Sequence, residues 1–306
     1  MYRTITLPNG ARILTEHIPG VRSAALGFFV GAGSRHERAE ENGAAHFIEH
    51  MSFKGTSRRS AADLAMEMDA IGGQVNAYML CDMLFDSRFD EGEAALERGV
   101  ILEEIGMYED APEDLCAERL AMAVYKGRPL GRPILGKAST LEQMTGESLR
   151  RWQKEHYVPG AIVAALAGSF EERHVEDLSR RLSALPEAPL PKVREAVYLP
   201  AVTVRKKAIE QNHLTLAFPG LPLSDPRRFT LQLLSSILGG GMSSRLFQQV
   251  REQKGLCYSI YSYGTCHDDT GYFGVYTALG KETEGQALDT ILAVIRDFAD
   301  HGVTQA

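Results

Sequence analysis

The order of predicted secondary structure repeats on either side of one proline-rich segment. Residues 185–200 contain four prolines, and proline neither continues a helix nor donates to a strand ladder, so this segment is predicted to be a linker. After it comes a strand, two helices, two strands and a helix, an order similar to that of the first half. The chain is therefore predicted to be an α+β protein with a duplicated domain, divided into residues 1–184 and 201–306.

Composition and charge exclude several classes of protein. The chain has 33 Lys and Arg residues against 40 Asp and Glu residues, a net charge of −7, which argues against a nucleic-acid partner. No apolar run approaches the roughly 18 residues of a membrane span. No basic segment followed by an apolar one begins the chain, so we expect no secretory signal, no membrane contact and a cytoplasmic location.

The sharpest local feature is the segment His46–His50. On a helix, positions i, i+3 and i+4 share one face, so His46, Glu49 and His50 project together. Phe47 and Ile48 then point toward the core. Two neutral imidazoles on adjacent turns can grip zinc. The alternative is a surface helix that carries three polar residues, but AAHFIEHMSF is too apolar for a fully solvated helix.

A catalytic zinc needs a third protein ligand and an open position for water. In the helical stretch LERGVILEEIGMYED, Glu97 and Glu104 are seven residues apart and share one face, with Glu103 turned away. Glu104 is the predicted third ligand, and Glu97 is predicted to orient a ligating imidazole. Acidic residues are common on helices, so two ordinary surface carboxylates remain the alternative. One Zn²⁺ per chain is expected.

The segments HFIEHMSFKGT, GGQVNAY, ERGVILEEIGMYED and SSRLFQQVREQKGLCYSIYS resemble the pitrilysin/insulinase family of inverted-motif zinc peptidases. The mitochondrial processing peptidases belong to that family. The resemblance implies two homologous α+β domains, each with a mostly antiparallel sheet packed against helices. It further implies a homodimer or a heterodimer with a related subunit, in which two clamshell halves enclose a chamber for the peptide substrate.

The resemblance also implies a role for each matching residue. It assigns His46, His50 and Glu104 to the metal, Glu49 to the general base and Glu97 to the support of a ligand.

On the substrate side, the resemblance implies that Arg251 and Tyr258 complete the site from the second domain. It places Asn76, Ala77 and Tyr78 on an edge strand that binds an extended peptide through its main chain.

Two departures from the family pattern bear on these expectations. The interval from His50 to Glu104 is shorter than is usual in the family, and the shortfall follows NAYM, where relatives continue with a strand and the first part of a helix. Either the chain takes a shorter route that still delivers Glu104, or it folds poorly and binds zinc weakly. The chain also ends at Ala306, before relatives do, so we expect a shortened gene product with an incomplete second domain.

Together these features favour a zinc-dependent endopeptidase that hydrolyses short or unfolded peptides. The alternative is a catalytically impaired subunit that binds peptides or assembles with an active relative.

Overall fold

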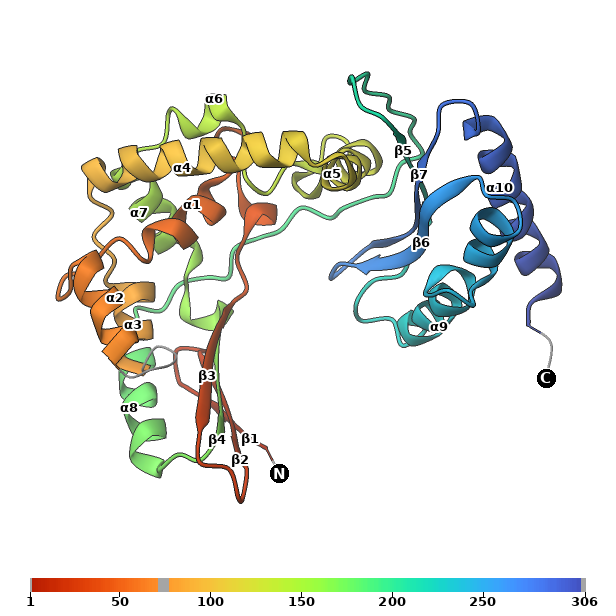
Figure 1. Ribbon diagram of the computed structural model, residues 1–306. Helices are drawn as coiled ribbons and strands as arrows, with labels where there is room; N and C mark the ends of the chain where they lie inside the picture. The colour runs from red at the N-terminus through yellow and green to blue at the C-terminus, as the bar shows by residue number, and fades with distance from the viewer. Residues whose placement is uncertain (1, 71–76, 304–306) are drawn as a thin grey trace. The chain divides into compact units, whose positions relative to one another are not determined.

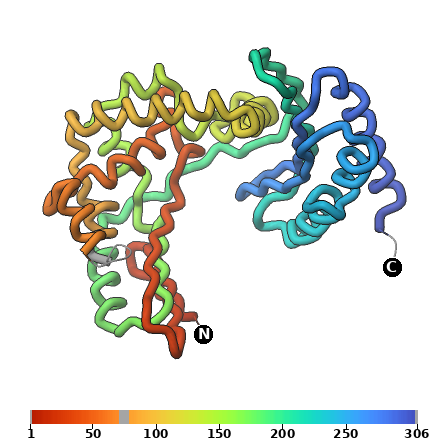
Figure 2. Tube along the Cα trace, in the orientation of Figure 1, coloured from red at the N-terminus to blue at the C-terminus, as the bar shows by residue number. Residues whose placement is uncertain are grey.

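The computed structural model describes residues 2–70 and 77–303, and the chain forms two compact units. The first unit contains Met1–Ile105 and Arg132–Val193, and the second contains Gly106–Gly131 and Arg194–Ala306 (Figures 1 and 2). Residues 106–131, predicted in the first domain, thus make their contacts within the second unit. The predicted linker contains the boundary at Val193, and residues 186–209 have neither helix nor strand. Each unit is described by itself below.

The described strands of the first unit form one sheet in the order β1-β2-β4-β3. Their bounds are Arg3–Thr6 for β1, Arg12–His17 for β2, Ala24–Val30 for β3 and Ile162–Gly168 for β4. β4 runs parallel to β2 and antiparallel to β3, and β1 is antiparallel to β2. Alternate residues of β4 are buried, as expected of a strand whose two faces meet different surroundings.

The helices of the first unit are held by two hydrophobic cores and a smaller cluster between α2 and α3. Their bounds are Ala44–Met51 for α1, Ala61–Ala70 for α2, Ala77–Phe85 for α3, Glu91–Asp110 for α4, Ala138–Leu141 for α6, Gly146–His156 for α7 and Glu172–Ser183 for α8. The last turn of α4 belongs to the second unit. One core joins the sheet to α8 through Val175, Leu178 and Leu182, and α8 lies along the sheet in Figure 1. The other core joins α1, α4 and α7.

Short 3₁₀ segments occur in the connections of both units. They span Ser34–His36, Ala39–Glu41, Pro129–Gly131 and Pro159–Ala161.

One secondary-structure prediction was wrong. Asn76, Ala77 and Tyr78 were predicted to lie on a strand, but Ala77–Phe85 forms helix α3; residues 71–76 lie outside the described part of the chain. Met79 and Met83, four residues apart, pack against Leu64 of α2. Cys81 and Phe85, again four apart, face the core of the sheet. Because both apolar pairs have helical spacing, a helix buries them on two sides, which a strand of this sequence would not do.

In the second unit, the described strands form an antiparallel sheet in the order β5-β7-β6. Its elements are α5 at Pro112–Val124, β5 at Asn212–Pro219, α9 at Arg228–Gly239, a π-helical segment η5 at Phe247–Glu252, β6 at Cys257–Cys266, β7 at Gly271–Leu279 and α10 at Glu284–His301. α9, η5 and α10 supply the core on one face of this sheet. The end of α5 packs with Tyr272 on the other face, so every residue of the central strand β7 is buried.

The predicted α+β class is confirmed. Each unit contains one described sheet with helices packed against it, and most of the described strand pairs are antiparallel. Within residues 2–70 and 77–303, no helix is both long and apolar enough to cross a membrane.

Candidate metal centre

Helix α1 carries the predicted histidine ligands on the side opposite its buried face. Phe47, Ile48 and Met51 are almost fully buried in the core shared with α4 and α7. This packing leaves His46 and His50 on the remaining face, where 12 % and 21 % of their side-chain surfaces are exposed. The helix therefore presents both imidazoles together, anchored by the apolar residues between them.

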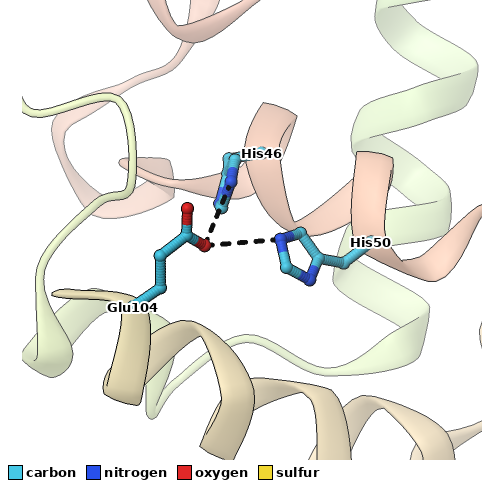
Figure 3. Close-up of side chains that lie close together, drawn as sticks. All are labelled: His46, His50 and Glu104. Carbon is cyan, nitrogen blue, oxygen red and sulfur yellow. Dashed lines mark ion pairs between the residues drawn. The ribbon is translucent and has the colours of Figure 1, made fainter. Parts of the chain in front are cut away.

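Helix α4 brings Glu104 to the two imidazoles. Ala94 and Ile101 bury one side of α4 in the same core, which places Glu104 opposite α1. The Glu104 Oε2 atom lies 3.5 Å from the Nε2 atom of each histidine, and the nearest ligand atoms of the three residues lie within 4.8 Å of one another. Figure 3 shows the three side chains converging from the two helices.

These separations and donor types suit zinc. Two ligand atoms about 2.0–2.2 Å from a tetrahedral zinc ion are themselves about 3.3–3.6 Å apart, which matches the 3.5 Å distances here. Burial first, and the charge of His50 second, lower the pKa of His46 below its ordinary value, so this imidazole is neutral near pH 7, as a metal ligand must be. The buried Nδ1 atom of His46 has no hydrogen-bond partner among the described residues.

His50 is oriented by a carboxylate that is itself paired with a lysine. The Glu97 Oε1 atom lies 2.9 Å from His50 Nδ1, and Glu97 Oε2 lies 2.5 Å from Lys54 Nζ. Burial raises the pKa of Glu97, but the hydrogen bonds and charges of Lys54 and His50 outweigh it and hold that pKa below its ordinary value. Glu97 is therefore ionised and keeps the Nδ1 proton of His50, which leaves His50 Nε2 free to bind a metal.

Glu49 lies beside these residues but outside the group of metal-binding atoms. It precedes His50 on α1 and its side chain is exposed. Burial first, and the negative charge of Glu49 second, raise the pKa of Tyr157. The same charge opposes the lowering of the His46 pKa by burial and by His50. The role of Glu49 as the general base stays a prediction.

The structure brings Arg251 and Tyr258 together within the second unit. The Arg251 guanidinium carbon lies 5.5 Å from the centre of the Tyr258 ring, and Arg251 also forms an ion pair with Glu252 at 2.7 Å. Tyr258 is 77 % exposed. The metal-binding group belongs to the first unit, so the role of this pair in the site stays a prediction.

The predicted peptide-binding strand is not present at its described positions. Asn76 lies outside the described residues, and Ala77 and Tyr78 begin helix α3. A helix satisfies its main-chain groups internally, so it offers no edge to an extended peptide.

Two residues at this centre were missed by sequence reasoning, Lys54 and Glu37. The position of Lys54, four residues after His50, is a signal that it could continue the same face. Glu37 accepts hydrogen bonds from the amide nitrogens of Gly43 and Ala45 at the start of α1. Nothing in the local pattern around Glu37 indicates this contact, because it depends on how the preceding connection folds back.

Comparison with known families accounts for most of the chain. Residues 12–84 match the insulinase family (peptidase family M16), and residues 143–306 match the M16 inactive domain. The first match contains His46, Glu49 and His50, whereas Glu97 and Glu104 lie in neither matched range. The assignment of Glu104 to the metal-binding group therefore rests on geometry.

Curated relatives are similar over nearly the whole chain. An uncharacterised zinc protease of Bacillus subtilis, YmxG, is 39 % identical over 327 residues that cover 99 % of this chain and 80 % of the relative. An uncharacterised zinc protease of Streptomyces coelicolor is 38 % identical, covering 99 % of this chain and 73 % of the relative. Because the first alignment is longer than the 306 residues here, that relative has residues without a counterpart in this chain.

Solved structures show the same fold at low sequence identity. An M16 inactive domain from Pseudomonas fluorescens has a TM-score of 0.87 at 22 % identity, covering 100 % of this chain and 81 % of that one. A protease from Helicobacter pylori has a TM-score of 0.89 at 19 % identity, with the same coverage. Taken with the family matches and the curated relatives, these findings show that the chain belongs to peptidase family M16, the insulinase family.

Proposed function

We propose that this chain is a zinc-dependent endopeptidase that hydrolyses short or unfolded peptides. The observation that carries the proposal is the convergence of His46, His50 and Glu104, whose ligand atoms lie within 4.8 Å of one another on two helices packed in one core. The oriented imidazole of His50 supports it, because Glu97 leaves the metal-facing nitrogen free of a proton. The zinc protease names of the curated relatives support it as well.

The residues of the centre divide the chemistry between them. Bound zinc supplies a Lewis acid that lowers the pKa of water toward 7 and polarises a peptide carbonyl. His46, His50 and Glu104 would hold the ion. Glu49 takes the proton of the attacking water and returns it to the leaving amine, because its carboxylate lies next to the ligands without being one of them.

A partner subunit, identical or related, is part of the proposal. One support is a chain of complex III2 from Candida albicans that has the same fold, with a TM-score of 0.80 at 18 % identity. Light scattering coupled to size-exclusion chromatography measures the mass in solution and distinguishes a dimer from a 33.7 kDa chain.

The test compares two adjacent glutamates of α4. Glu104→Gln removes a predicted ligand, whereas Glu103→Gln changes an exposed neighbour on the same helix and serves as the control. We expect about one zinc per chain in the wild type and in Glu103→Gln, and at least a hundredfold weaker binding in Glu104→Gln. Cleavage of a quenched peptide by the wild type is expected to stop when a chelator is added and to return with zinc.

Glu49→Gln tests the catalytic role separately. The variant is expected to bind zinc normally and to lose nearly all cleavage, because an amide cannot accept the proton. Normal turnover in this variant would remove Glu49 from the mechanism.

The alternative function is a catalytically impaired subunit that binds peptides or assembles with a relative. It is favoured by one observation, the helix α3 where a peptide-binding strand was expected. A wild-type chain that binds no zinc and cleaves no peptide would support this alternative and contradict the first proposal.

A further inference from the structure

The metal-binding helix α1 begins without a capping side chain of its own. Gly43 occupies the N-cap position with φ 102°, and no side chain there accepts a hydrogen bond. A Cβ atom at Gly43 would lie 2.8 Å from the Leu135 carbonyl oxygen, so the serine or aspartate that usually caps a helix does not fit. The first amide groups of a helix nevertheless require acceptors, which must come from elsewhere in the chain.

Glu37 supplies these acceptors from the preceding connection. Its Oε2 atom accepts from Gly43 N at 3.0 Å, and its Oε1 atom accepts from Ala45 N at 2.9 Å. Asn42 Nδ2 donates to the same Oε2 atom at 3.0 Å. Glu37 is only 2 % exposed, so water does not compete for these bonds. A carboxylate at this end of a helix also complements the helix dipole.

The surrounding contacts hold the capping group in place. Asn42 donates to the Pro133 carbonyl at 2.9 Å, and the Thr140 hydroxyl donates to the Asn42 carbonyl at 2.7 Å. Arg132 Nη1 donates to the Glu37 carbonyl at 2.6 Å. The start of α1 is therefore clamped between Glu37 and the segment from Arg132 to Thr140.

We propose that Glu37 is a positioning residue of the metal centre, whose carboxylate fixes the first turn of α1 and so sets the place of the His46 and His50 imidazoles. An eight-residue helix is too short to be stable by itself, and Ala45, whose amide Glu37 binds, directly precedes His46. This inference rests on the proposed zinc function, because it concerns the geometry of the same ligands.

The experiment uses Glu37→Gln with Glu41→Gln as its control. Glutamine keeps the size of the side chain but replaces one acceptor oxygen with an amino group that faces a donor. Glu41 lies in the same connection and accepts a hydrogen bond from Arg38 N at 3.0 Å. Its variant therefore changes a hydrogen bond within the connection and not one at the start of α1. Zinc affinity is measured by competition with a chelator, and amide hydrogen exchange is followed in the metal-free full chain.

We expect Glu37→Gln to bind zinc about 10–100-fold more weakly than the wild type, as for other groups that orient metal ligands. The Gly43 and Ala45 amides should exchange faster in this variant, while those of β2 and β4 keep their wild-type rates. Glu41→Gln should keep wild-type zinc affinity. Glu37→Asp, whose shorter carboxylate cannot reach both amides, should lose less zinc affinity than Glu37→Gln. If Glu37→Gln does not fold, the zinc affinity of Glu37→Asp is the test of the inference.

Unchanged zinc affinity in the folded variant, or unchanged exchange at Gly43 and Ala45, overturns the inference. An equal loss in Glu41→Gln overturns it too, because a general disturbance of the connection would then suffice. These results are distinguishable from failure of the proposed function, in which the wild type itself binds no zinc.

Discussion

Replacing Glu97 by glutamine tests how far the carboxylate that orients His50 contributes to zinc binding. In the structure, this side chain joins His50 Nδ1 at 2.9 Å to Lys54 Nζ at 2.5 Å, and Glu97 is 6 % exposed. A hydrogen bond to a charged group contributes about 1.5–3 kcal/mol. Because His50 and Lys54 are partly open to solvent, we expect the lower half of this range, which corresponds to an affinity loss of about 10–50-fold.

The assay is a competition titration with a chelator of known zinc affinity, with circular dichroism to establish that each variant is folded. Lys54→Met is expected to weaken binding by a smaller factor, about fivefold, because Lys54 acts on the metal through Glu97. In the double variant, the Lys54 change should then have no further effect. Unchanged affinity in Glu97→Gln, or additive effects in the double variant, would refute the reasoning.

Two further predictions concern the stability of the metal-free chain. His46 has a folded-state pKa below its ordinary value of 6.5, chiefly because of burial, so the unfolded chain binds the proton first as pH falls. Unfolding by urea should therefore become easier below about pH 6.5, and less steeply so in His46→Gln; equal pH dependence would contradict the burial of a neutral ring. Asp82, 1 % exposed in α3, forms ion pairs with Arg58, Arg59 and Arg181. Asp82→Asn should lower the free energy of unfolding by about 2–4 kcal/mol, a range discounted for the solvent exposure of the arginines. The control Asp86→Asn changes an exposed carboxylate and should have little effect. Equal losses of unfolding free energy in the two variants would exclude a stabilising role for the Asp82 ion pairs.

The zinc-site geometry could be anticipated in part from local periodicity. The spacing of His46 and His50 places both rings on one helix face whatever else the chain does, and the spacing of seven between Glu97 and Glu104 does the same on α4. Both helices form as predicted. The meeting of the two faces depends on the packing of α1 and α4 in one core, which no local pattern describes.

Other features depended on the environment of each segment. The strand that was predicted to contain Ala77 and Tyr78 is instead the start of helix α3. In this helix, two apolar pairs and Asp82 contact partners on different sides. The contact of Glu37 with the start of α1 arises because Gly43 has no room for a capping side chain beside Leu135. The cytoplasmic location, the dimer and the roles of Arg251 and Tyr258 stay predictions.

The amino-acid sequence by itself thus determined the chemical groups and the face of each helix that carries them, because a helix repeats every 3.6 residues wherever it lies. Only the tertiary structure decided which distant residues contact these groups. It places Glu104 opposite the imidazoles, Lys54 beside Glu97, and Glu37 at the first turn of α1. These partners are set by the burial of apolar surface and by the need of each buried polar group for a bond, and both are properties of the packed chain.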